Sequence, residues 1–390
     1  MRLLFEDFCE VTSSKRCHLS ERSNKGVPFY RSKEIIQAFN GEKITDCDYI
    51  DEDLYASIRN KFGVPQPGDL LVTSRGSIGV PYLYTDADRF YFADGNLTWL
   101  RNFDSQADSR FLYYWFLSPV GKHTVDSCAK GTAQKAVAIE ALKRSSIDLP
   151  VVGAQRRIAS ILMAYDNIIE NNRRQITLLE EAADLTFANW RDACDRASFE
   201  TGVMTDFFDI TIGKTPPRAQ AECFVAEGVP WASVKDLGNT PGPYISSTNE
   251  CLTDEAIENY KVKVKPAGTI LLSFKLTIGR IAIAEQPTAT NEAIAHFETD
   301  NDAIRLYTYE YLRSFDYDTL GSTSSIGKAI NSKIVKAIPF RLPNKSDLDQ
   351  LYSQLNPLFC LMRICQQRAS LLIEARDRLL PKLMSGEVEV

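Results

Sequence analysis

The chain repeats itself, and this internal duplication constrains its fold more than any other feature of the sequence. The stretch from Gly68 to Gly79 returns from Gly268 to Gly279 with most positions identical or similar. The segment from Asp7 to Lys15 likewise returns from Asp206 to Lys214, and further short blocks repeat in the same order. Because several blocks in register do not readily match by chance, we infer two copies of a unit of roughly 190 to 200 residues, each a globular part followed by a helix.

Each copy ends in a segment whose apolar residues recur at alternating steps of three and four, the spacing of a helix that packs along one stripe. This seam consists of Leu162, Tyr165, Ile169, Asn172, Ile176 and Leu179 in the first helix and of Leu351, Leu355, Leu358, Met362, Leu372 and Leu379 in the second. Such a stripe must be buried, and the helix of the other copy is the nearest partner; the alternative is that each helix packs on its own globular part.

Three residues stand out within the two seams. Asn172 is expected to fix the register or the partner of the first helix, since a polar seam residue reduces stability in exchange for specificity. Arg376 interrupts the apolar series of the second helix. Pro357 is expected to kink or restart that helix, because proline lacks the N–H of a helical hydrogen bond.

The globular parts are predicted to mix helices and strands. Short, largely apolar runs at 70–73 and 270–273 follow a glycine turn and open hairpins, whereas the aromatic segments 111–117 and 309–314 favour short core helices. The predicted fold class is therefore α+β, with two similar hairpin-rich domains, two long helices and a pseudo-two-fold internal repeat. We predict the globular domains at 1–153 and 200–343, and the helices at 154–199 and 344–390.

Composition excludes some classes of protein. Hydrophobic residues make up 44% of the chain, yet no apolar run reaches the ~18 residues that span a bilayer. The first ten residues lack the basic start and apolar core of a secretory signal, so we expect a cytoplasmic protein with reduced cysteines. The net charge is −6, and neither the domains nor the helices are basic, so any contact with nucleic acid must come from local patches.

Motifs that carry catalysis are missing from the sequence. Gly213-Lys214-Thr215 imitates the end of a phosphate-binding loop, but its first glycine is absent and two prolines follow. No lysine has an acidic residue two positions before it, as many metal-dependent nucleases require, and the three histidines lack metal-ligand spacing. We therefore expect no catalytic residue and no bound metal in this chain, although an unfamiliar active site stays open.

Five segments resemble type I restriction-modification specificity subunits. The family's Pro-x-x-Glu-Gln-Arg-Arg-Ile helix is similar to Pro150 followed by residues 155–158, and its usual carboxyl terminus is similar to residues 379–388. The hairpin at 74–79 and its counterpart at 273–279 resemble the family's Ser-Arg-Gly-Thr-Ile-Gly block. Gly213-Lys214-Thr215-Pro216 resembles the block that opens a target recognition domain. These segments occur in the family's order along the whole chain.

This resemblance implies a non-catalytic DNA-reading scaffold. Two target recognition domains, held apart by an antiparallel pair of helices, would each read one half of a split asymmetric site in double-stranded DNA. Two methyltransferase subunits holding S-adenosylmethionine would dock on the helices, and endonuclease subunits using ATP and magnesium would lie outside them. No cofactor is expected in this chain itself. A coiled-coil adaptor that binds protein but no DNA is the alternative function.

Candidate DNA contacts are basic, amide and hydroxyl residues at equivalent places in the two repeats. They are Arg31, Lys33, Ser74, Arg75, Ser77, Lys130, Gln134 and Lys135 in the first domain, and Lys214, Lys235, Lys275, Thr277, Ser324 and Lys328 in the second. Arg75 and Gln134 have the chemistry to pair with a guanine or an adenine through two hydrogen bonds, whereas lysines more often contact phosphate. For each single residue, the alternative is an ordinary solvated side chain.

Overall fold

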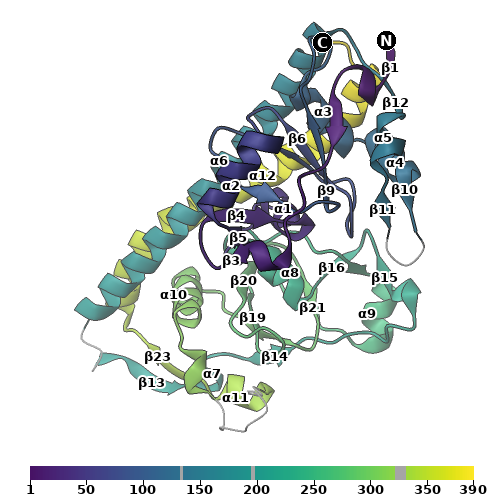
Figure 1. Ribbon diagram of the computed structural model, residues 1–390. Helices are drawn as coiled ribbons and strands as arrows, with labels where there is room; N and C mark the ends of the chain where they lie inside the picture. Colours follow the sequence, from purple (N-terminus) through teal and green to yellow (C-terminus); the bar gives the residue numbers. More distant parts are fainter. Residues whose placement is uncertain (132–134, 195–197, 321–330) are drawn as a thin grey trace. The chain divides into compact units, whose positions relative to one another are not determined.

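A computed structural model describes residues 1–131, 135–194, 198–320 and 331–390 (Figure 1). The chain divides into two compact units, Met1–Asn167 with Leu372–Val390 as unit 1 and Ile168–Leu371 as unit 2. Each unit therefore contains one repeat together with part of both long helices, α6 (Val152–Ala193) and α12 (Lys345–Ser385).

Unit 1 is built from two four-stranded sheets and two strand pairs. The first sheet has the order β2-β9-β6-β7 and is antiparallel; the second has the order β3-β5-β4-β8, with β4 and β8 parallel. The strands are β1 (Arg2–Leu4), β2 (Glu10–Thr12), β3 (Arg22–Ser23), β4 (Val27–Tyr30), β5 (Asp48–Ile50), β6 (Leu70–Thr73), β7 (Pro81–Leu83), β8 (Tyr91–Phe92), β9 (Leu97–Arg101), β10 (Ala129–Lys130), β11 (Ala136–Val137) and β12 (Ser146–Asp148). The shorter helices are α1 (Ser32–Phe39), α2 (Glu52–Phe62), α3 (Ser109–Leu117), α4 (Pro119–Cys128) and α5 (Ile139–Lys143).

Unit 2 repeats this plan. Its sheets have the orders β14-β22-β19-β20-β17 and β15-β18-β16-β21, and β13 pairs with β23 as β1 pairs with β12. The strands are β13 (Glu200–Val203), β14 (Ile210–Ile212), β15 (Phe224–Val225), β16 (Val229–Ala232), β17 (Tyr244–Ile245), β18 (Cys251–Leu252), β19 (Ile270–Ser273), β20 (Ile281–Ala284), β21 (Ala289–Thr290), β22 (Ile294–Phe297) and β23 (Pro339–Leu342). The helices are α7 (Met204–Phe207), α8 (Val234–Asn239), α9 (Asp254–Tyr260), α10 (Asp302–Arg313) and α11 (Ser332–Lys336).

The matching strand orders confirm the predicted α+β fold with an internal repeat. The sheet of β2, β9, β6 and β7 corresponds strand by strand to β14, β22, β19 and β20, and β17 is an addition in unit 2. The predicted aromatic helices are α3 and α10, and they do serve the core: Phe111, Trp115 and Tyr309 are all buried. Helix α6 begins at Val152, shortly after β12, and helix α12 begins at Lys345, shortly after β23.

The two long helices run antiparallel within each unit. In unit 1, Ile158 and Leu162 of α6 share a core with Leu380 and Leu383 of α12. Asp166, later in α6, pairs with Arg376, earlier in α12, so the two helices run in opposite directions. In unit 2, Gln175 accepts the thiol proton of Cys365 at 3.3 Å, and the later α6 residues Ala183 and Phe187 share a core with Leu351 and Leu355. Each helix packs on its globular part as well, because both cores also contain residues of the sheets.

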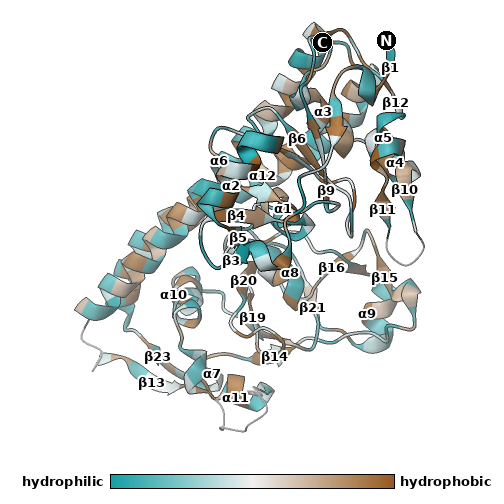
Figure 2. Ribbon diagram, viewed as in Figure 1, coloured by the Kyte–Doolittle hydropathy of each residue, from teal (hydrophilic) through white to brown (hydrophobic). Residues whose placement is uncertain are grey.

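Helix α12 continues through Pro357, so the helix does not restart there. Proline removes one backbone donor, but Leu355 and Phe359 on either side of it are almost completely buried. Burial of these two side chains offsets the loss of one helical hydrogen bond. Figure 2 shows how apolar and polar residues alternate along both long helices. Within the described ranges, no helix combines the length and the apolarity needed to cross a membrane.

Candidate nucleic-acid interface

An exposed loop at 74–79 links β6 to β7 in unit 1. The Thr73 hydroxyl donates to the Ser77 carbonyl at 2.6 Å and accepts the Val80 N–H at 2.9 Å, which closes the loop from inside. Arg75 and Ser77 are exposed at its tip. Ser74 is buried and its hydroxyl lies 2.6 Å from that of Thr98, so Ser74 supports the loop and does not reach the surface.

The corresponding loop at 274–279 in unit 2 has the same geometry. The Ser273 hydroxyl donates to the Thr277 carbonyl at 2.6 Å and accepts the Arg280 N–H at 2.9 Å. Lys275 and Thr277 are exposed, in the places of Arg75 and Ser77. A short loop closed by a side-chain hydroxyl thus presents one cation at an equivalent point of each repeat.

Other candidates gather around the loop of unit 1. The N–H of Ser74 and the hydroxyl of Ser32 both donate to the Asn96 carbonyl, at 2.7 and 3.0 Å, which ties the loop to the start of helix α1. Lys33 is exposed on the first turn of that helix, whereas Arg31 at its N-cap is half-buried and lies within 4 Å of the carboxylates of Glu34 and Asp48.

Hairpin β10–β11 borders the other side of the same loop. The Val137 N–H donates to the Ser74 carbonyl at 2.9 Å, and Arg75 forms a bridge with Ala136. Lys130 and Lys135 are exposed on this hairpin, so both lie in the same region as Arg75. Gln134 falls outside the described residues.

A polar cleft of about 420 Å³ adjoins Arg75, and sequence reasoning did not find it. Arg16, His18 and Arg22 line the cleft together with Arg75. Arg22 is held by Asp48 at 2.7 Å, while Arg16 and His18 are exposed. These residues lie far from Arg75 in the sequence, so only the folded chain reveals a polar cleft, which Asp94 also lines.

In unit 2, the position directly after β14 requires a glycine, Gly213. A Cβ atom at Gly213 would lie 2.1 Å from the Thr290 hydroxyl oxygen and 2.2 Å from the Asn291 carbonyl oxygen, so no side chain fits. The next N–H, of Lys214, donates to the Thr290 carbonyl at 2.9 Å, and the Lys214 side chain is exposed. The Gly-Lys-Thr-Pro block therefore holds β14 against β21 and presents one lysine outward.

Other cations of unit 2 surround the same surface. Lys235 is exposed on α8, and Arg218 stacks over the rings of Phe224 and Trp231 at 4.1 and 4.7 Å. Arg218 also pairs with Glu250 at 2.8 Å, and sequence reasoning missed it although it directly follows the Gly-Lys-Thr-Pro block and a second proline. Ser324 and Lys328 lie outside the described residues.

A buried histidine, His296, stabilises the strands next to Lys214. His296 of β22 is fully buried, with Nδ1 3.0 Å from the Thr211 hydroxyl and Nε2 2.6 Å from the Thr290 hydroxyl. Burial, aided by Lys265 and Lys263, lowers the pKa of the imidazole to about 3. The ring is therefore neutral and links three strands, β14, β21 and β22. Within the described residues, no group of three or more His, Cys, Asp or Glu side chains could hold a metal.

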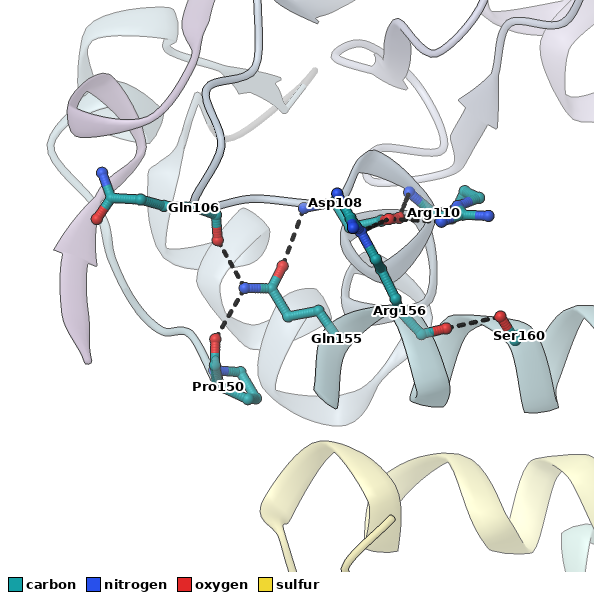
Figure 3. Close-up of polar contacts among 7 residues, drawn as sticks. All are labelled: Gln106, Asp108, Arg110, Pro150, Gln155, Arg156 and Ser160. Atoms are coloured by element: carbon teal, nitrogen blue, oxygen red, sulfur yellow. Dashed lines mark hydrogen bonds and ion pairs between the residues drawn. The ribbon is translucent and has the colours of Figure 1, made fainter. Parts of the chain in front are cut away.

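The start of α6 is fixed to the globular part of unit 1 by Gln155, whose side chain points from the helix into the loops above it (Figure 3). Its amide nitrogen donates to the Gln106 and Pro150 carbonyls at 2.7 and 2.8 Å, and its amide oxygen accepts the Asp108 N–H at 2.9 Å. Asp108 in turn caps α3 and lies 3.7 Å from Arg156. The Gln-Arg-Arg-Ile segment thus anchors the helix through a fully satisfied buried amide.

The predicted seam residues occupy a range of environments. Leu162, Ile169, Asn172, Ile176, Leu351, Leu355 and Met362 are buried, whereas Tyr165, Leu179, Leu358, Leu372 and Leu379 are half-buried. Asn172 donates to the Ile168 carbonyl of its own helix at 2.7 Å. The polar link across the helices in unit 1 is instead Arg376 with Asp166, which turns the interruption of the predicted seam into an ion pair.

Comparison with known proteins identifies the family. The chain matches the type I restriction modification DNA specificity domain over residues 5–181 and again over 198–366, once for each repeat. It belongs to this family of DNA specificity domains.

Individual relatives agree with this assignment. The type I restriction enzyme MjaIX specificity subunit of Methanocaldococcus jannaschii is 25% identical over 72% of this chain and 69% of its own length. A Haemophilus influenzae relative is 26% identical, over 48% of this chain and only 45% of the relative. The S subunit of a type I restriction-modification system from M. genitalium, a solved structure, has the same fold, with a TM-score of 0.59, 16% identity and coverage of 98% of this chain and 95% of that one.

Proposed function

We propose that this chain gives a type I restriction-modification complex its DNA sequence specificity by reading a split asymmetric site, one half with each globular domain. The observation that carries this proposal is the pair of equivalent loops, closed by Thr73 in one repeat and Ser273 in the other, that expose Arg75 and Lys275. Two similar domains with equivalent contact points can read two half-sites, and differences at the tips let the half-sites differ in sequence.

In the first domain Arg75 reads a base, and the lysines around it hold phosphates. A guanidinium can pair with the O6 and N7 atoms of guanine through two hydrogen bonds, which lysine cannot do with equal geometric precision. Lys33 on α1 and Lys130 and Lys135 on the β10–β11 hairpin lie on two sides of Arg75, an arrangement suited to contacts with more than one phosphate. In the second domain Lys214, Lys235 and Lys275 take the phosphate role.

The long helices carry the partner proteins. In unit 2, α12 turns Gln366 and Arg363 towards Tyr244 and Glu285 of the globular part. At about 100° per residue, the other side of α12 carries Leu361, which is 50% exposed. The exposed apolar residues of the two helices in unit 2 are Ile168, Leu178, Leu185, Leu361, Ile364 and Leu371. Such a surface suits helices of another protein, and we assign it to the methyltransferase subunits.

Under this proposal the partner subunits catalyse the reactions of the complex. The methyltransferase subunits hold S-adenosylmethionine, the endonuclease subunits use ATP and magnesium, and this chain supplies no catalytic residue. The complex acts on chromosomal DNA in the cytoplasm.

The proposal is tested by comparing Arg75→Ala with Lys275→Ala in a complex that methylates DNA. Loss of a bidentate base contact weakens discrimination by about 1–3 kcal/mol, or roughly fivefold to 150-fold, at one base pair. We expect Arg75→Ala to relax one position of the half-site read by the first domain and to leave the other half-site unchanged. Lys275→Ala should lower affinity on all sequences and reduce the salt dependence. A uniform loss with Arg75→Ala would contradict the base-reading role.

A further inference from the structure

The tip of the second loop holds a leucine where the first loop has glycine. Leu276 has a φ of 65° and Gly76 a φ of 77°, so both residues adopt the left-handed backbone conformation. The same hydroxyl bonds close the two loops, at Thr73 and at Ser273. The loop therefore demands this conformation at its tip whichever residue is present, and glycine is the residue that adopts it without strain.

Folding gives Leu276 no compensation for its position. The left-handed conformation brings the Cβ atom of an L-residue close to the following backbone, which disfavours a bulky side chain there. The Leu276 side chain is also 89% exposed, so it gains little from burial within the chain. A residue that is unfavourable on both counts is a candidate for a contact outside the protein.

The residues beside Leu276 are polar and charged. Lys275 and Thr277 flank it, and the Lys275 ammonium lies 5.5 Å from the centre of the Phe274 ring. Glu292 accepts a hydrogen bond from Thr215, which lowers the pKa of the carboxyl group, and the nearby charges of Lys275 and Arg218 lower it further. The exposed Lys275 ammonium can contact a phosphate, and the C5-methyl group of thymine is the apolar group that DNA presents in its major groove.

We propose that Leu276 packs against a thymine C5-methyl group in the half-site read by the second domain. This inference rests on the proposed function and adds to it a difference between the domains. In the first domain the guanidinium of Arg75 recognises a base, and Gly76 beside it has no side chain to take part. In the second domain Leu276 at the equivalent position makes an apolar contact with a base. The single leucine at the tip thus distinguishes one base pair while Lys275 holds the phosphate beside it.

Uracil in place of thymine removes only the methyl group and so tests the contact directly. The complex with the methyltransferase subunits is titrated with duplexes in which each thymine of the second half-site is replaced in turn. We expect the unaltered complex to lose about threefold to tenfold in affinity at one position and none at the others. Leu276→Gly should bind the thymine duplex more weakly and show no thymine–uracil difference at that position. Leu276→Met should retain the difference.

Thermal unfolding separates this role from a structural one. Because glycine suits the left-handed conformation, Leu276→Gly should leave Tm unchanged or raise it while weakening DNA binding. Retained thymine–uracil discrimination in Leu276→Gly would overturn the inference and leave the proposed function standing. Loss of the methyltransferase subunits with unchanged DNA affinity would also overturn it, since Leu276 would then contact protein. An unaltered complex without any sequence preference would overturn both proposals.

Discussion

Arg376 of α12 donates to Asp166 of α6 at 2.6 Å, and the other oxygen of the same carboxylate accepts the Tyr114 hydroxyl at 2.5 Å. Asp166 thereby joins both long helices and helix α3 in unit 1. The Arg376 and Asp166 side chains are 28% and 31% exposed, and they lie among the apolar contacts of the helix pair. A slip of one helix along the other would separate the two charges, so the pair specifies register.

Removal of this pair should destabilise unit 1. Arg376→Ala leaves the Asp166 carboxylate partly buried without its cation, and we expect a loss of about 1–3 kcal/mol after allowance for solvent screening. Chemical denaturation followed through the unfolding of unit 1 measures the loss. Arg378→Ala is the matched control, because Arg378 lies on the same helix, is 79% exposed and pairs only along the surface with Glu374. Equal effects of the two substitutions would contradict the assigned role.

The buried amide of Gln155 should be required for the attachment of α6. Gln155→Ala leaves the Gln106 and Pro150 carbonyls and the Asp108 N–H without their partner, and we expect a loss of about 2–4 kcal/mol. Hydrogen exchange of the Asp108 amide should accelerate in this variant. Gln106→Ala is the control, because it retains the backbone carbonyl that Gln155 contacts, and it should leave this amide protected. An unchanged exchange rate in Gln155→Ala would show that the network is dispensable.

The buried His296 should make unit 2 sensitive to acid. The folded-state pKa is about 3 against an ordinary value of 6.5, so between these values the unfolded chain binds a proton that the folded chain does not. The contribution of His296 to the free energy of unfolding is therefore complete above pH 6.5. As the pH falls below 6.5, this contribution decreases by about 1.4 kcal/mol per pH unit. His296→Gln should remove this part of the slope in unfolding curves between pH 4.5 and 6.5. Identical slopes for the unaltered protein and for His296→Gln would refute the linkage.

The exposed apolar residues of the long helices should be needed for assembly. Leu178 and Leu361 are 55% and 50% exposed, so Leu178→Lys and Leu361→Lys should fold normally. We expect both variants to lose copurification with the methyltransferase subunits, because a charged side chain resists burial in an apolar interface. Leu19→Lys provides the control, since Leu19 is 78% exposed and lies outside the two long helices. Full assembly of the two helix variants would place the interface elsewhere.

Much of the fold could be predicted because duplication and helical periodicity can be recognised in short stretches of the sequence. The hairpins at 70–83 and 270–284 and the core helices α3 and α10 all appear where their patterns indicate. The division of the helices between two units could not be predicted, because it depends on which distant residues share a core. Leu380 and Leu383, near the end of the chain, pack with Phe5 and Phe8 near its beginning.

The candidate interface was harder to predict than the fold. The sequence pointed to Arg75 and Lys275 because they lie in repeated blocks, but it did not reveal that Ser74, next to Arg75, is buried. The cleft at Arg16 and His18 arises only when distant strands come together. The left-handed backbone at Leu276 has no local sequence signal at all, since leucine rarely adopts it.

The most direct test of the central claim maps N6-methyladenine across the host genome with and without this chain. We predict that one split asymmetric motif is methylated when the chain and its methyltransferase subunits are present and that it disappears when the chain is deleted. Exchange of residues 200–343 for those of another specificity subunit should replace one half of the motif and keep the other. Methylation that persists unchanged after deletion would contradict the account.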